Sequence, residues 1–178
     1  KLSQRNAERA KVQSLVTFKQ GDIFVEDFSQ ASVLTLYLGE NLNTKLMPTI
    51  LKMQAGTRVV SNTFRMEGWI PDQEVRISNG EMAYLWIVPA DIDGSWQWNG
   101  PSGLSDLRLV LRQKKQFVDG TLYQGSKRIA HFEDGRIRGS DLEFAFTYQN
   151  INYAFKGKIS GPSMTGNLNN NSSLAVSA

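Results

Sequence analysis

The apolar and polar positions in the first half of the chain follow two different spacings. Continuous apolar runs, such as ASVLTLYL at 31–38, are typical of strands in a sheet covered on both faces. Apolar residues three and four apart, such as Leu42, Leu46 and Ile50, are typical of an amphipathic helix. The pattern predicts helices over 2–12 and 42–51 and strands over 14–23, 31–38 and 57–64. This order predicts a parallel α/β sheet with at least three parallel strands in residues 10–64.

Two residues near the second predicted helix refine its limits. Pro48 lies inside the helical stripe and predicts a kink or a restart, because proline lacks the N–H that a helix needs. Gly56 is predicted to end that helix as a left-handed residue. Two further strands over 74–78 and 82–88 are predicted to form an antiparallel edge hairpin about SNGE.

The spacing changes at PADIDG, residues 89–94, after which the helical pattern disappears. Short strands that alternate apolar and polar residues follow, separated by turns rich in Gly and Asp. This rhythm predicts an antiparallel barrel-like domain of about six to eight strands. The inward-facing positions are predicted to be Leu107, Leu109, Leu111, Leu142, Phe144 and Phe146, with Arg112 facing outward. We therefore divide the chain into an α/β unit (1–93), a barrel-like unit (94–170) and a flexible polar tail (171–178).

Composition narrows the chemistry that the chain can perform. The 178 residues contain no cysteine, which excludes disulfides, thiolate metal sites and cysteine nucleophiles. The only histidine, His131, cannot build a histidine-cluster metal site, and in RIAHFEDG it fits a strand or turn residue better than a catalyst. We expect no metal site, and no membrane partner, because no apolar run is long enough to span a bilayer.

The net charge is +3, and the basic residues of the C-terminal half are scattered as RLVLRQKK, SKRI and RIRG. Lysine and arginine commonly protect sheet edges in this way. The chain has no stretch similar to the RGFGFV motif of the common RNA-binding sheet. Nucleic-acid binding through the basic β surface therefore has the least support among the possible functions.

Two stretches resemble a known family: NAERAKVQSLVTFKQGDIF (6–24) and ASVLTLYLGENLNTKLMPTILKMQAGTRVVSNTF (31–64). They resemble the second half of class I S-adenosylmethionine-dependent methyltransferases, in particular the bacterial branch related to protein-lysine methyltransferases. GWIPD (68–72) and YLWIVPA (84–90) resemble the same branch. The resemblance covers roughly residues 1–90. It implies a partial Rossmann-like sheet, S-adenosylmethionine as cofactor, and an amine as acceptor, with protein lysine as a candidate.

The resemblance also implies which residues form the site. In that branch a strand ends in Gly-Asp and an apolar residue, so Asp22 is expected to accept a hydrogen bond from adenine and Ile23 to cover the ring. Tyr37 is expected at the end of the next strand, in both the cofactor and the transfer site, followed by Glu40 and Asn41 at the substrate mouth. Two simpler interpretations remain open: Asp22 caps a turn, and Tyr37 belongs to the core.

The sequence departs from the family in two ways. The glycine-rich loop that binds the methionine moiety and the acidic residue that binds the ribose are absent from the 178 residues. We expect both to precede Lys1, and the 178 residues alone to be inactive. Gly39 also stands where relatives commonly carry a bulkier residue, which leaves substrate specificity open.

The second unit resembles small lipocalin-like barrels, through GSWQWNG (94–100) and FKGKISGPSMTGNL (155–168). Such a module could hold a ligand or a protein partner. The alternative is that the second unit binds nothing and only stabilises the protein. In that case Trp96 and Trp98 are structural residues, one in the core and one on the surface of the strand. Two main functions therefore remain: part of an amine methyltransferase with an accessory β domain, or a non-enzymatic binding module built on residues 94–170.

Overall fold

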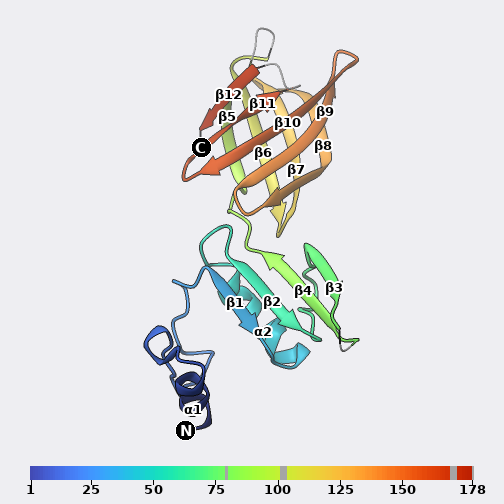
Figure 1. Ribbon diagram of the computed structural model, residues 1–178. Helices are drawn as coiled ribbons and strands as arrows, with labels where there is room; N and C mark the ends of the chain where they lie inside the picture. Colours follow the sequence, from blue (N-terminus) through green and yellow to red (C-terminus); the bar gives the residue numbers. More distant parts are fainter. Residues whose placement is uncertain (79, 101–103, 169–171, 178) are drawn as a thin grey trace.

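The computed structural model describes residues 1–78, 80–100, 104–168 and 172–177, the last range by its backbone alone. Figure 1 shows two units in succession, an α/β unit that holds the N-terminus and a barrel that holds the C-terminus. A four-stranded sheet forms the first unit and a closed barrel forms the second. Each unit buries its own hydrophobic cluster.

The N-terminal segment is helical only at its start. Helix α1 spans Leu2–Arg9, and a single 3-10 turn, η1, spans Gln13–Leu15. The strand predicted over 14–23 is wrong, because residues 16–32 form turns and irregular backbone. A strand needs a neighbour for its N–H and C=O groups, and this segment pairs with no strand in the described part of the chain. Several of its apolar side chains consequently stay in water, with Leu15 81% and Val25 82% exposed, whereas Ile23 and Phe28 pack against the α/β core.

The sheet of the first unit has the order β1-β2-β4-β3. Strands β1 (Val33–Leu36) and β2 (Arg58–Asn62) are parallel, and helix α2 (Glu40–Ile50) connects them. Strands β3 (Gln73–Arg76) and β4 (Met82–Ile87) form the predicted antiparallel hairpin. The prediction of at least three parallel strands is wrong: residues 10–64 contain two, because the segment before β1 does not join the sheet.

Helix α2 differs from its prediction in three details. It continues through Pro48 without a restart and ends at Ile50, with Leu51 as its C-cap. Gly56, with φ +90°, lies in the turn before β2 and so does not end the helix. The buried face consists of Asn43, Leu46 and Ile50, whereas Leu42 is 39% exposed. The polar side chain of Asn43 therefore lies on the buried face, where the apolar stripe had placed Leu42.

The second unit is an antiparallel barrel of consecutive strands that closes where the last strand pairs with the first. The number of strands falls within the predicted range. The strands are β5 (Gly94–Asn99), β6 (Leu107–Lys114), β7 (Phe117–Gln124), β8 (Lys127–Arg138), β9 (Asp141–Tyr148), β10 (Ile151–Ser160), β11 (Ser163–Leu168) and β12 (Ser172–Ser177).

Strand β12 lies where a flexible tail was expected. It pairs with β11 on one side and with β5 on the other, as Figure 1 shows. The polar composition of this segment predicted fraying. The composition of a segment does not show whether neighbouring strands need a partner. Here the open edges of β11 and β5 carry unpaired N–H and C=O groups, and β12 pairs with both.

Aromatic side chains fill the barrel. All six positions predicted to face inward are buried, at most 4% exposed. Trp96 and Trp98 are both buried, which corrects their assignment to core and surface, because residues two apart in a strand share a face. Trp98 contacts the rings of Phe144, Phe146 and Phe155. Side chains of the described residues therefore occupy the space in which a lipocalin-like barrel would hold a ligand.

Candidate functional site

The carboxyl ends of the two parallel strands form one edge of the sheet. Leu36 of β1 lies beside Ser61 of β2, so the segments that follow both strands leave the sheet side by side. The first segment leads into the N-terminus of α2. The second is the β2–β3 loop, residues 63–72. Ligand sites of α/β sheets lie outside such carboxyl ends.

A buried asparagine joins these two segments. The Asn43 side chain is fully buried, and its Nδ2 donates to Ser61 Oγ at 3.0 Å and to the Phe64 carbonyl at 3.2 Å. Next to it, Thr44 Oγ1 accepts the backbone N–H of Glu67 at 2.9 Å. The start of α2 therefore fixes the β2–β3 loop. Sequence reasoning missed Asn43, although a polar residue in register with Leu46 and Ile50 was a usable signal.

The predicted catalytic residues lie together at this edge. Tyr37 directly follows β1 and is 75% exposed, so it is not a core residue. Glu40 is the first residue of α2, and Asn41 follows it with an exposed side chain. Close by, the Arg65 guanidinium stacks over the Tyr84 ring at 4.8 Å and donates to Glu74 Oε2 at 2.9 Å. A side-chain hydrogen bond with Tyr84 is the main cause that raises the pKa of the Arg65 guanidinium.

The predicted cofactor residues Asp22 and Ile23 lie in a turn. Asp22 Oδ1 accepts the backbone N–H of Phe24 at 2.9 Å, and its carbonyl accepts the N–H groups of Val25 and Glu26. Ile23 is half-buried and packs against the α/β core. The arrangement predicted for Asp22 and Tyr37, at the ends of neighbouring strands, is wrong, because Asp22 follows no strand. The roles of Asp22, Ile23 and Tyr37 in cofactor binding stay predictions.

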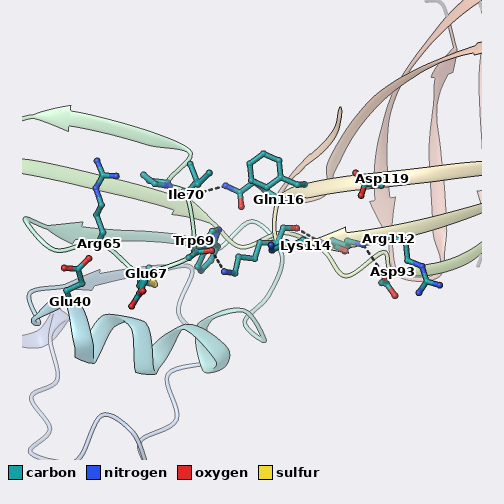
Figure 2. Close-up of a pocket in the computed structure, with 16 residues that line it drawn as sticks. Glu40, Arg65, Glu67, Trp69, Ile70, Asp93, Arg112, Lys114, Gln116 and Asp119 are labelled. Atoms are coloured by element: carbon teal, nitrogen blue, oxygen red, sulfur yellow. Dashed lines mark hydrogen bonds between the residues drawn. The ribbon is translucent and has the colours of Figure 1, made fainter. Parts of the chain in front are cut away.

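A cleft of about 650 Å³ lies between the β2–β3 loop and the barrel, and Figure 2 shows its lining. Its lining consists of Glu40, residues 65–71, Asp93, residues 112–117 and Asp119. Among these described residues the charges balance: the carboxylates are Glu40, Glu67, Asp93 and Asp119, and the cations are Arg65, Arg112, Lys114 and Lys115. Glu40 and Glu67 lie at one end of the cleft and Asp93 and Asp119 at the other (Figure 2). The cleft therefore connects the predicted substrate mouth with the barrel.

The β6–β7 turn, residues 115–116, attaches the barrel to the β2–β3 loop. Lys115 has φ 59°, and its Nζ donates to the carbonyl of Gly68. Gln116 is 1% exposed and donates through Nε2 to the carbonyl of Ile70 at 2.6 Å. Burial lowers the pKa of the Lys115 amine, and the neighbouring charge of Lys114 adds to this effect. Both side chains thus reach from the second unit into the first.

Gln113 fixes the connection between the units. Its Nε2 donates to the Ala90 carbonyl at 2.9 Å, and its Oε1 accepts the N–H of Ile92 at 2.8 Å. A second close approach is that of Gly139 and Gly56, where a methyl group on Gly139 would lie 3.1 Å from the Gly56 Cα atom. These contacts join the two units beside the cleft.

The remaining candidates lie elsewhere. His131, on β8, contacts Thr121 Oγ1 at 2.9 Å and Glu133 Oε1 at 3.4 Å and does not line the cleft. Within the described ranges, no three histidine, cysteine or acidic residues are grouped as metal ligands. In the same ranges, no helix has the length and apolar character required to span a membrane.

Comparison with known proteins finds similarity in the first half of the chain. Residues 1–73 match the family model described as ANTKMT methyltransferase domain. A curated protein-lysine N-methyltransferase of Saccharolobus islandicus (strain REY15A) is 34% identical over 87 residues, which are 47% of this chain and 54% of that protein. The chain therefore spans about half the length of this curated relative.

A solved structure with a similar sequence is also known. It is an RNA methyltransferase from Salinibacter ruber in complex with S-adenosyl-L-homocysteine, 43% identical, with a TM-score of 0.48. The alignment covers 51% of this chain and 59% of that chain. The match to the methyltransferase family model ends at residue 73, and the barrel lies outside it.

Proposed function

We propose that this chain takes part in methyl transfer from S-adenosylmethionine to an amine, with a protein lysine as acceptor. The observation that carries the proposal is the match of residues 1–73 to a methyltransferase domain, which includes both parallel strands and the edge that holds Tyr37, Glu40 and Asn41. The name of the curated relative favours protein lysine as the acceptor. Whether the chain belongs to the bacterial branch stays a prediction.

The residues present fit one side of the cofactor. The Asp22 carboxylate is exposed and makes one hydrogen bond to a backbone N–H, so it retains capacity to accept a bond from an adenine amine. Ile23, half-buried beside it, would offer an apolar surface to the ring. The groups that would hold the methionine and ribose moieties are not among the 178 residues. When bound, the cofactor supplies an activated methyl group.

The chain's own residues would orient the acceptor. An amine must lose its proton and direct its lone pair at the methyl group, so the protein contributes mainly alignment and a proton acceptor. The Glu40 carboxylate, at the start of α2 and within the cleft, would bind the amine as a cation and accept its proton. The Asn41 amide, one residue later, would hold the deprotonated amine, and Tyr37 would line the transfer site.

The 178 residues alone are expected to bind S-adenosylmethionine weakly. The backbone N–H groups of a glycine-rich loop and the ribose-binding acid are not present in this sequence, so a large part of the binding energy is missing. Isothermal titration calorimetry with the isolated chain measures this directly. Micromolar affinity, about −8 kcal/mol, would contradict the expectation and would mean that the pocket is assembled in another way.

Substitutions in the full-length protein test the assigned roles. Asp22→Ala is expected to raise the dissociation constant for S-adenosylmethionine, because the adenine amine loses its acceptor. Asn41→Ala is expected to lower the rate of transfer and to leave cofactor affinity unchanged, because it acts on the acceptor amine. Binding is measured by calorimetry and transfer by mass spectrometry. The controls are Asp134→Ala and Asn99→Ala on the exposed surface of the barrel; equal effects of site and control variants would contradict the assignment.

The alternative, a ligand-binding module built on the barrel, has less support. A ligand inside the barrel would have to displace packed side chains, among them Phe132 and Phe144, whose rings stack at 4.3 Å. The surface of the barrel that faces the cleft instead combines with the α/β unit. A role for the barrel together with the methyltransferase unit therefore fits the structure better than a separate function.

A further inference from the structure

Resting on the proposed function, we propose that the cleft between the β2–β3 loop and the β6–β7 turn binds an extended segment of the acceptor protein, and that its target lysine lies at the Glu40 end. The barrel then contributes one wall of the acceptor site. The cleft's volume of about 650 Å³ lies within the range of about 300–1,000 Å³ that is usual for ligand sites.

The charge of the cleft favours a polypeptide over a nucleic acid. The described lining residues contain four carboxylates and four cations. A groove that follows a phosphate backbone needs an excess of cations, because each phosphate is neutralised by lysine or arginine. A polypeptide segment of mixed charge has no such requirement. Such a segment can place cations against Glu67 and Asp119 and anions against Arg112 and Lys114.

Two carboxylates at the α/β end are available for a lysine. Within the described ranges, neither Glu40 nor Glu67 forms an ion pair, and both side chains are exposed. The nearby cation Arg65 is already paired with Glu74, which does not line the cleft. Arg65 also attracts Glu40 at longer range, so an incoming ammonium group meets Glu67 and a Glu40 carboxylate that Arg65 compensates only in part.

The apolar lining offers further contacts that a polypeptide would satisfy. Ile70 is 60% exposed, although it lies in the cleft. An apolar side chain of the bound segment can cover Ile70 and remove its surface from water.

The experiment uses the full-length protein and a fluorescent peptide with one central lysine flanked by acidic, basic and leucine residues. Fluorescence anisotropy gives the dissociation constant. Glu67→Gln and Asp119→Asn, from the two ends of the cleft, are each expected to raise it about threefold to fivefold, the loss of one exposed ion pair. Glu143→Gln, on the outer face of the barrel and paired with Lys156, is the matched control and is expected to change nothing.

Steady-state kinetics distinguishes a loss of peptide binding in the cleft from a general disturbance of the structure. In Asp119→Asn, at the barrel end of the cleft, KM for the peptide is expected to rise, while kcat and KM for S-adenosylmethionine stay unchanged. A photo-crosslinking peptide is expected to label residues 65–71 and 112–119. The proposal is overturned by unchanged peptide affinity in both variants, by crosslinks that all lie elsewhere, or by displacement of the peptide by single-stranded RNA. Peptide bound in the cleft without any methyl transfer would instead count against the proposed function alone.

Discussion

Phe144→Ala is expected to destabilise the barrel by about 3–5 kcal/mol, the cost usual for deleting a buried phenylalanine ring. Phe144 is 4% exposed and lies in the centre of an aromatic cluster. Its ring stacks on Phe132 at 4.3 Å and on Phe155 at 4.8 Å, and it also contacts Trp98. Because rings surround it on several sides, the cavity left by alanine cannot close without moving whole strands.

Native-state hydrogen exchange of the β9 and β10 amides measures this loss in the barrel separately from the α/β unit. Glu143→Ala is the control, since Glu143 precedes Phe144 on the same strand and points outward. Its ion pair with Lys156 is exposed on both sides, so we expect a loss below about 1 kcal/mol. Small, equal losses at both positions would mean that the alternation along β9 does not face a core.

Gly166→Ala is expected to destabilise the barrel by about 1–3 kcal/mol, the cost usual for inserting a methyl group into a packed interior. Gly166 of β11 pairs directly with Gly157 of β10. A methyl group on Gly166 would lie 2.4 Å from the Lys156 carbonyl oxygen and 2.6 Å from the Phe155 ring. The first of these contacts is with backbone, so a side-chain rotation cannot relieve it.

Gly39→Ala is the matched control for this substitution. Gly39 has φ −66°, and a methyl group there would meet no atom within 4 Å. Stability is therefore expected to change by less than about 1 kcal/mol, because the restriction of the unfolded chain by alanine opposes its poorer fit at the N-cap of α2. Chemical denaturation of both variants makes the comparison. A Gly166→Ala variant as stable as Gly39→Ala would contradict the close contact of β10 and β11.

The features predicted well from sequence are those that a short segment determines. The alternation of LRLVLRQ and LEFAFTYQ identified the inward faces of β6 and β9, because a period of two fixes the face of every residue. The β3–β4 hairpin was also predicted from local pattern, whereas the roles of Tyr37, Glu40 and Asn41 came from the family resemblance and stay predictions. The strand over 14–23 failed for the complementary reason: an apolar run shows that burial would be favourable, not that a neighbouring strand is present.

The cleft could not be predicted from local patterns. Its walls meet where Lys115 contacts Gly68, 47 residues earlier, and Gln116 contacts Ile70, 46 residues earlier. Neither contact leaves a periodic signal, because each joins a side chain in a turn to a backbone carbonyl in a loop. Of the predicted site residues, Glu40 alone lines the cleft. Only the three-dimensional structure shows that the barrel lies beside Glu40 and forms a wall of the cleft.

The central claim, methyl transfer to a protein amine at the edge formed by β1 and β2, is tested most directly by following a labelled methyl group. The full-length protein is incubated with S-adenosylmethionine carrying an isotopically labelled methyl, together with a lysine-bearing protein, and mass spectrometry locates the label. We predict label on the side-chain nitrogen of lysine, strongly reduced in Asn41→Ala and retained in the control Asn99→Ala. A folded protein that binds S-adenosylmethionine but labels no amine, or labels only RNA, would contradict the account.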